Sequence, residues 1–149
     1  MKKILFVCTG NTCRSPMAEA LLKYKSEAVH VKSAGLFAYE GCPANEHAIE
    51  ALKEKGISCD HRSRQVNGEL LRWADLVLTM TEGHKQTLLS QFPEHDKKIH
   101  TFKRYINIDD DSADIVDPFG GSLDTYRETL AELEALIDQL IEKIEKERE

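Results

Sequence analysis

The fold is decided near the amino terminus by the stretch Ile4-Leu5-Phe6-Val7-Cys8-Thr9-Gly10-Asn11-Thr12-Cys13-Arg14-Ser15-Pro16. Its first residues form an apolar run that predicts a buried strand over residues 3–8. Ser15 is a preferred N-cap residue, and Pro16 suits the first helical position because its missing N–H is not needed there. We therefore expect a tight loop between this strand and a helix over residues 16–28.

A loop of this kind suits an anion. Its backbone N–H groups can point inward, and the positive end of the following helix adds to the attraction. Beside a cation at a helix N-terminus, the pKa of a thiol can fall from about 8.5 to roughly 3.5–7.5. Cys8 is thus a candidate nucleophile, and the planar fork of Arg14 matches two phosphate oxygens. The alternative, a structural turn with Cys8 and Cys13 as small buried hydrophobes, leaves a buried Arg14 without a partner.

The pattern Cys-x5-Arg-Ser after a strand is the phosphate loop of cysteine-dependent phosphatases. The run from Val7 to Glu19 resembles the low-molecular-weight protein tyrosine phosphatase family, and more narrowly its bacterial protein-arginine phosphatases. The resemblance implies that Ser15 donates its hydroxyl to the Cys8 sulfur and that the Asn11 side chain braces the loop. A left-handed backbone would suit Asn11. The loop residues expected to bind substrate are Thr9, Gly10, Asn11, Thr12, Cys13 and Ser15.

A second motif, Asp117-Pro118-Phe119-Gly120-Gly121, supplies the acid that such a nucleophile needs. Pro118 stiffens the chain and disfavours helix at Asp117. The motif precedes the last predicted helix, where the resembled family carries its general acid. The implied reaction has two steps: Cys8 takes the phosphoryl group while Asp117 protonates the leaving atom, and water activated by Asp117 then hydrolyses the thiophosphate. No metal or cofactor is needed.

Two positions bear on the substrate. The tyrosine-specific members commonly carry Ile where this chain has Thr12, and two adjacent tyrosines where it has Phe119-Gly120. A hydroxyl at Thr12 can contact a guanidinium N–H, and Phe119 offers a surface on which a planar guanidinium can lie. These features favour phosphoarginine in proteins as substrate. In the alternative, a tyrosine phosphatase, Thr12 is a neutral β-branched replacement.

Other function classes fit less well. Arsenate reductases share the loop but need a downstream cysteine pair, and no cysteine follows Cys59. A non-catalytic phosphate-binding module would not need both Cys8 and Asp117. In the resembled family the second loop cysteine, here Cys13, can form a disulfide with the nucleophile; a packing role stays equally open. The resemblance also implies pairing with a protein arginine kinase and a role in stress response.

Bulk properties predict one soluble domain over residues 1–149. The net charge is −6 and the charges form no basic stripe, which argues against nucleic acid. Four cysteines in a chain of this length indicate neither a disulfide framework nor a zinc site, and we expect a cytoplasmic protein. The first apolar stretch is too short for a signal peptide, and none reaches transmembrane length. The cluster Asp109-Asp110-Asp111 lacks the Gly and terminal Glu of a calcium loop. We expect a monomer.

Strands and helices alternate along the chain, which predicts an α/β fold of parallel βαβ units with right-handed crossovers. The resemblance implies a three-layer sandwich around a four-stranded parallel sheet of order 2-1-3-4. The first helix should bury Met17, Ala20, Leu21 and Tyr24. Thr81 should cap a helix that ends before Pro93. The other expected strands are 29–33, 75–80 and 98–102, and the other expected helices are 44–55, which Gly56 closes, and 69–74.

Ser122 should cap the last helix, whose apolar residues recur at spacings of three and four: Leu123, Tyr126, Leu130, Leu133, Ile137, Leu140 and Ile144. We favour docking of this stripe on the sheet over a coiled-coil dimer. Three smaller expectations concern other parts of the chain. The family resemblance implies that His61 to Arg64 folds against the phosphate loop. Residues 33–38 should form a wall beside the mouth of the site. His47, His84, His95 and His100 show no ligand spacing.

Overall fold

A computed structural model describes residues 2–107 and 113–147 of the chain. The aspartate cluster at 109–111 lies outside these residues, so its interpretation as a solvated bend stays a prediction. Within the described part, no helix combines the length and apolar character needed to cross a membrane.

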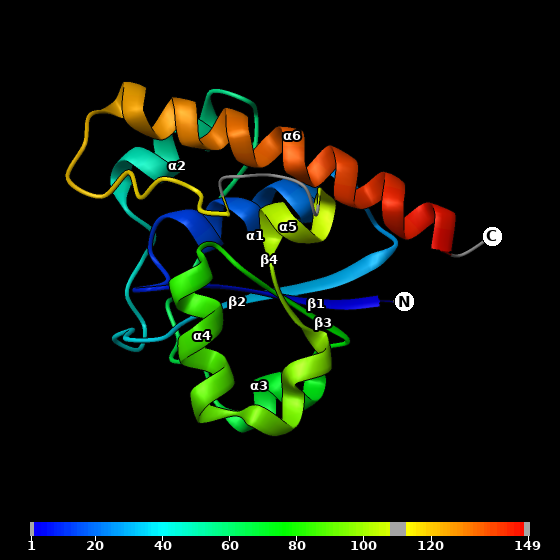
Figure 1. Cartoon of the computed structure of the whole chain (residues 1–149). Helices are drawn as coiled ribbons and strands as arrows, with labels where there is room; N and C mark the ends of the chain where they lie inside the picture. The colour runs from blue at the N-terminus through cyan, green and yellow to red at the C-terminus, as the bar shows by residue number, and fades with distance from the viewer. Residues whose placement is uncertain (1, 108–112, 148–149) are drawn as a thin grey trace.

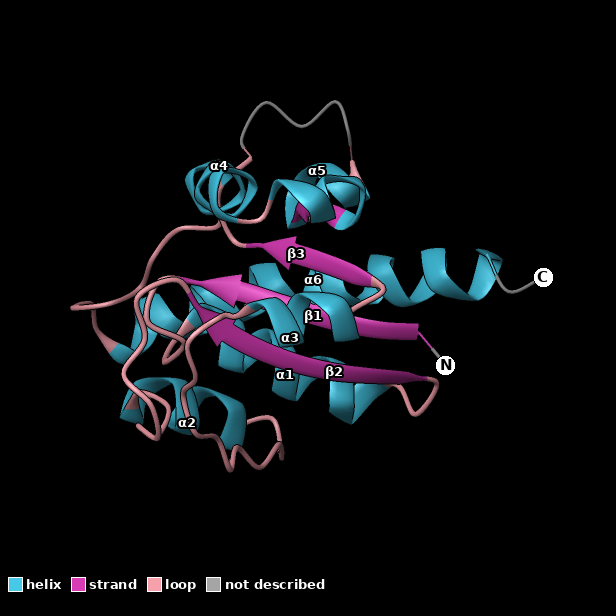
Figure 2. Cartoon of the chain, turned by 90° about the horizontal axis from the view of Figure 1, so that it is seen from below, coloured by secondary structure: helices cyan, strands magenta, loops and turns pink. Residues whose placement is uncertain are grey.

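Four parallel strands form one sheet in the order β2-β1-β3-β4, as expected. Their bounds are β1 Lys2–Cys8, β2 Val29–Gly35, β3 Leu76–Thr79 and β4 Ile99–Thr101. Figure 2 shows β2, β1 and β3 side by side. Both faces of β1 are covered, because Ile4 and Phe6 belong to one buried cluster while Leu5 and Val7 belong to another. A central strand that is buried on both sides makes a rigid support for the loop that begins at Cys8.

Helices cover the two faces of the sheet unequally (Figure 1). One face carries α1 Arg14–Lys25, α2 Glu46–Lys53, α5 Phe102–Ile106 and α6 Leu123–Glu147, and the other carries α3 Gly68–Trp73 and α4 Glu82–Gln91. A short 3-10 helix, η1 Pro93–Lys98, leads into β4. Thr81 caps α4 as predicted, since its side chain accepts a hydrogen bond from the amide of His84. Gly56 follows α2 with φ of +77° and ends it in the left-handed conformation that was predicted.

The start of α1 corrects one prediction. The helix begins at Arg14, Cys13 occupies the N-cap position, and no side chain caps it. Ser15 therefore lies inside the first turn, and its hydroxyl is used instead by the loop itself, in contacts with Cys8 and Asn11. Tyr24 was also wrongly placed on the inner face, because it is 62% exposed; the helix turns its end away from the core after Leu21 and Leu22.

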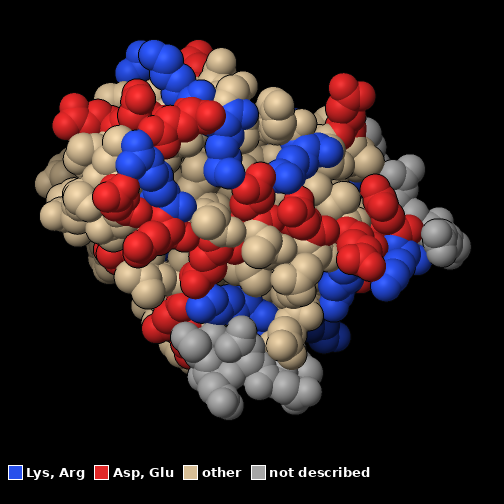
Figure 3. Space-filling view, turned by 90° about the horizontal axis from the view of Figure 1, so that it is seen from above, with Lys and Arg blue, Asp and Glu red and all other residues tan. Residues whose placement is uncertain are grey.

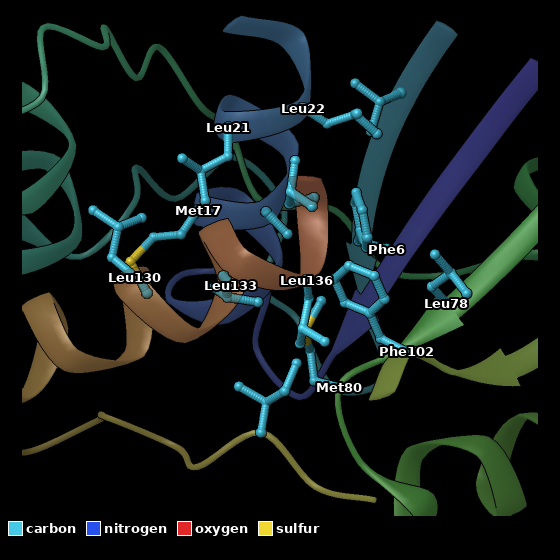
Figure 4. Close-up of a cluster of buried hydrophobic side chains, with 14 of the residues drawn as sticks. Phe6, Met17, Leu21, Leu22, Leu78, Met80, Phe102, Leu130, Leu133 and Leu136 are labelled. Carbon is cyan, nitrogen blue, oxygen red and sulfur yellow. The ribbon is translucent and has the colours of Figure 1, made fainter. Parts of the chain in front are cut away.

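The long helix α6 docks within the same chain, in agreement with the favoured interpretation of its stripe. The described stripe residues from Tyr126 to Ile144 are buried, and Leu123 packs against them at the edge. Their side chains join those of α1 and the sheet in one apolar cluster (Figure 4). Because this cluster uses the stripe, α6 needs no second chain to cover it.

The outer face of α6 forms ion pairs with neighbouring helices. Arg127 Nε lies 2.8 Å from Glu54 Oε1, and Glu134 contacts both Lys25 and Lys55, at 3.1 and 2.9 Å. Acidic and basic side chains alternate on this face (Figure 3). Exposed pairs of this kind contribute little to stability, so apolar burial holds the helix in place.

Candidate active site

The loop from Cys8 to Ser15 connects the carboxyl end of β1 to α1, and Asn11 organises it. The backbone of Asn11 is left-handed, with φ of +58°, and its side chain is fully buried. Asn11 Nδ2 donates to Ser15 Oγ at 2.8 Å and to Ser33 Oγ at 2.9 Å, while Oδ1 accepts from the Arg64 amide at 2.9 Å. The loop is thus tied to β2 and to the segment after α2.

His61 completes this bracing. Its Nε2 lies 2.7 Å from the Asn11 carbonyl oxygen, which confirms that the segment His61 to Arg64 folds against the phosphate loop. Burial lowers the pKa of His61, so the ring is held in its neutral form. A neutral ring still offers one N–H, which can donate to that carbonyl.

Cys8 lies at the centre of the loop and is 3% exposed. Its Sγ is 2.8 Å from Ser15 Oγ. Because Ser15 Oγ already accepts from Asn11, the hydroxyl hydrogen is free to donate to sulfur. The predicted Ser15–Cys8 contact is therefore present.

Arg14 is buried, and it joins the loop to the segment that carries Asp117. Its guanidinium Nη1 donates to the Ile115 carbonyl at 3.0 Å, and Nη2 lies 3.6 Å from Asp117 Oδ2. The Asp117 side chain is 52% exposed and accepts from the Phe119 amide at 3.0 Å. The carboxylate therefore stands over the loop while remaining open to solvent.

Two backbone anchors hold the Asp117 segment. The Ile115 amide donates to the Met80 carbonyl at 2.9 Å, next to the end of β3. Asp114 Oδ1 accepts from the amide of Glu82, the first residue of α4, at 2.8 Å. Sequence reasoning missed these anchors, because nothing local marks Asp114 as a helix cap.

One cavity of about 220 Å³ brings most of the predicted residues together. Its lining consists of Cys8, Thr9, Gly10, Thr12, Cys13, Arg14, Asp117 and Phe119. Asn11 and Ser15 were predicted to bind substrate, but both are fully buried behind the loop and do not line the cavity. Their contacts support the loop from inside. A larger hollow of about 630 Å³ beside Lys32 and Trp73 lacks the thiol, so we place the site in the smaller cavity.

The second loop cysteine has a buried partner that the sequence did not indicate. Cys13 Sγ lies 3.3 Å from the hydroxyl of Tyr126 on α6, and burial raises the pKa of the Cys13 thiol. Both Cys13 and Cys8 are free thiols here. The structure thus gives Cys13 a packing role and leaves its redox role a prediction.

His84 is a further residue that spacing could not reveal. Its Nε2 lies 2.8 Å from Thr9 Oγ1, and the ring is 7% exposed. Burial, with repulsion from Arg14, lowers the pKa of His84 to about 4. The ring is therefore neutral at physiological pH.

The segment over residues 33–38 lies against the phosphate loop, but none of its residues lines the cavity, so its role as a wall beside the mouth stays a prediction. The amide of Leu36 donates to the Cys8 carbonyl and that of Phe37 to the Thr9 carbonyl, at 3.0 and 2.9 Å. The Phe37 side chain is 70% exposed, next to a loop whose other aromatic neighbour, Phe119, is 72% exposed. Of these two aromatic residues, only Phe119 lines the cavity.

Comparison with known proteins shows which family carries a site of this kind. The family described as low molecular weight phosphotyrosine protein phosphatase matches residues 3–149. A curated protein-arginine-phosphatase from Geobacillus stearothermophilus is 53% identical, with 98% of each chain covered, and one from Bacillus subtilis is 50% identical, with 97% of this chain and 98% of that one covered.

Solved structures agree. A YwlE arginine phosphatase from Geobacillus stearothermophilus superimposes with a TM-score of 0.96 at 52% identity, covering 99% of this chain and 96% of that one. A cysteine-to-serine mutant of a YwlE arginine phosphatase, solved with a phosphorylated active-site serine, gives 0.94 at 49% identity, covering 98% and 97% of the two chains.

Proposed function

This chain belongs to the low molecular weight phosphotyrosine protein phosphatase family, and we propose that it hydrolyses phosphoarginine in proteins. The observation that carries the proposal is the lining of the cavity at Cys8. Thr12 and Phe119 lie in it together with Asp117, so a hydroxyl, an aromatic ring and a carboxylate surround the place of the leaving group. Two relatives of about half identity are named for this activity.

The proposed nucleophile is Cys8. Its thiolate attacks phosphorus, an S–P bond forms, and the P–N bond to the substrate guanidine breaks. Asp117 gives its proton to the leaving nitrogen. Water then attacks the thiophosphate, Asp117 takes a proton from it, and the S–P bond breaks to return the thiolate and release phosphate. The phosphorylated serine of the related mutant supports a covalent intermediate at this position.

Arg14 and the loop amides have the electrostatic role in this proposal. A phosphoryl group in transfer carries charge on three equatorial oxygens, and catalysis depends on donors that are already aimed at them. The buried guanidinium of Arg14 is held in place by the Ile115 carbonyl, which limits its reorganisation during the reaction.

Substrate choice follows from the same lining. The guanidinium group that leaves is cationic and planar. It can stack on the exposed ring of Phe119, can share an N–H with Thr12 Oγ1, and is attracted by the carboxylate that Asp117 becomes once it has given up its proton. The phenyl group of phosphotyrosine could stack only on the ring of Phe119, because it has neither a positive charge nor an N–H group.

Phosphate release from a phosphoarginine-bearing protein, measured beside a phosphotyrosine peptide, tests the proposal. We expect a higher kcat/KM on the phosphoarginine protein and no turnover of either substrate by Cys8→Ala. A preference for the phosphotyrosine peptide would instead support the second candidate, a low-molecular-weight protein tyrosine phosphatase. The matching family description and the aromatic Phe119 beside the nucleophile favour that candidate. Turnover that survives Cys8→Ala would contradict both.

We propose a single-domain, monomeric, cytoplasmic enzyme that acts on proteins modified by a protein arginine kinase in stress response, without nucleic acid, membrane or metal. The burial of the α6 stripe within one chain supports the monomer. Sedimentation of the purified protein would test it.

A further inference from the structure

Thr9, the residue after the nucleophile, is held from two sides. Its carbonyl accepts from the Phe37 amide at 2.9 Å, and its hydroxyl oxygen lies 2.8 Å from His84 Nε2. Thr9 is exposed and lines the cavity, whereas His84 comes from the first turn of α4 and is buried. The buried imidazole of His84, from a distant element, thus makes a hydrogen bond with the hydroxyl of the exposed Thr9.

The surroundings of His84 decide which partner donates. The ring is neutral, because burial and Arg14 disfavour its charged form more than Asp114 and Asp117 favour it. A neutral imidazole carries one hydrogen, on either Nε2 or Nδ1. Within the described residues, His84 Nδ1 is buried and has no hydrogen-bond partner. A hydrogen on Nδ1 would therefore be a buried donor without an acceptor, which is rarer in proteins than an acceptor without a donor.

We propose that His84 is a positioning residue of the phosphate site, whose Nε2–H donates to Thr9 Oγ1 and so reserves the Thr9 hydroxyl hydrogen for an oxygen of the phosphoryl group. A hydroxyl has one hydrogen and two lone pairs. Once Oγ1 accepts from His84, its own hydrogen can only be given elsewhere, and the cavity that Thr9 lines is where an anionic acceptor would be bound.

The inference deepens the proposed function but does not depend on the choice between phosphoarginine and phosphotyrosine, since both carry the same phosphoryl group. Inorganic phosphate is therefore a suitable probe. Its affinity can be measured as the protection that it gives Cys8 against alkylation by iodoacetamide, which requires no turnover. If the protein fails to release phosphate from a phosphoarginine-bearing protein, the protection measurement can still be made. If phosphate affinity does not depend on His84, the proposed activity on phosphoarginine is unaffected.

A double-mutant cycle tests the proposal. Thr9→Val keeps the side-chain shape and removes the hydroxyl; His84→Leu removes the donor. A hydrogen bond to a charged group is worth enough for each single variant to weaken phosphate binding about tenfold. The double variant should bind phosphate no more weakly than either single variant, because both act on one hydroxyl. His84→Gln, which retains an N–H donor at similar reach, should restore most of the affinity.

A matched control separates positioning from simple stability. Thr81→Ala removes the side-chain cap of the same helix, whose oxygen accepts from the His84 amide at 3.0 Å, without removing the Thr9 contact. It should lower Tm and leave phosphate affinity unchanged. Unchanged phosphate affinity in Thr9→Val, or additive losses in the double variant, would overturn the proposal. So would a fall in Tm in His84→Leu without loss of phosphate binding.

Discussion

Asn11 shows how much one residue can fix in this site. Its left-handed backbone turns the loop, and its buried amide distributes hydrogen bonds to Ser15, Ser33 and Arg64. An alanine would lose all three contacts and would also be strained at this φ. The orientation of the Ser15 hydroxyl toward Cys8 depends on the same amide, so the surroundings of the sulfur are set by a side chain that does not line the cavity.

Asp117→Asn should separate the two proton transfers. An amide cannot protonate a leaving nitrogen, so we expect the first step on phosphoarginine to slow by roughly 10²–10⁴-fold. An aryl phosphate such as p-nitrophenyl phosphate leaves without a proton, and its burst phase should slow much less. Rapid-quench measurement of both bursts checks this. Asp124→Asn, on the exposed surface of α6, serves as the control, and equal slowing of both substrates by Asp117→Asn would contradict the assigned role.

Thr12→Ile should shift the substrate preference. The change removes the hydroxyl that we assign to the guanidinium and adds apolar surface that suits a phenyl ring, an effect of roughly tenfold in relative kcat/KM toward phosphotyrosine. Thr12→Ser, which retains the hydroxyl, should stay close to the parent. If kcat/KM for both substrates is the same in Thr12→Ile as in the parent, Thr12 does not determine specificity.

At the scale of elements, the backbone of the phosphate loop lies directly against Gly35, the last residue of β2. A Cβ at Gly35 would lie 2.5 Å from the Thr9 carbonyl oxygen and 3.0 Å from the Asn11 amide. These neighbours are backbone atoms of the loop and cannot swing aside as a side chain would. The close approach explains why β2 ends in glycine beside the site.

Gly35→Ala should therefore disturb the loop more than the fold. We expect kcat/KM to fall by about tenfold or more, because small displacements of positioned groups have large effects on catalysis. Gly83→Ala is the matched control: it lies within α4, the nearest atom to its Cβ is the Thr81 hydroxyl at 3.6 Å, and alanine favours helix. Full activity in Gly35→Ala would show that the loop adapts to the added methyl group.

At the scale of the whole molecule, buried neutral histidines make stability depend on pH. The pKa of His84 is lowered to about 4, against about 6.5 in an unfolded chain, and burial lowers the pKa of His61 too. Between these values the unfolded state binds protons that the folded state does not. The free energy of unfolding therefore decreases as the pH falls from about 6.5 to about 4.

For His84 this loss amounts to at most about 3.5 kcal/mol, because the pKa difference between about 6.5 and about 4 is worth about 1.4 kcal/mol per unit. Urea unfolding at pH 7.5 and 4.5 measures it. The decrease should be smaller in His84→Gln, whose side chain does not titrate, while carboxylates such as Glu82 contribute equally to both proteins. The same decrease in both would show that His84 does not contribute.

The amino-acid sequence by itself determined the strand-loop-helix at Cys8, the sheet order implied by family resemblance, and the acid motif at Asp117. The sheet order is not a local pattern and followed only from the family resemblance. The strand-loop-helix and the acid motif are local patterns, because strand and helix periods, proline and glycine act through neighbouring residues. It also placed the α6 stripe correctly. The N-cap prediction for Ser15 was wrong. A serine that caps a helix and a serine whose hydroxyl serves the loop give the same local sequence pattern.

Only the tertiary structure decided which distant residues contact the phosphate loop and the segment that carries Asp117. His84, Tyr126 and Asp114 reach the site from elements that are far away in the chain, and their contacts with Thr9, Cys13 and the α4 amide exist only because the parallel sheet gathers the ends of its strands at one edge. A hydrogen bond between distant residues leaves no periodic signal in either segment. Its partners are fixed by packing, which the whole chain determines together.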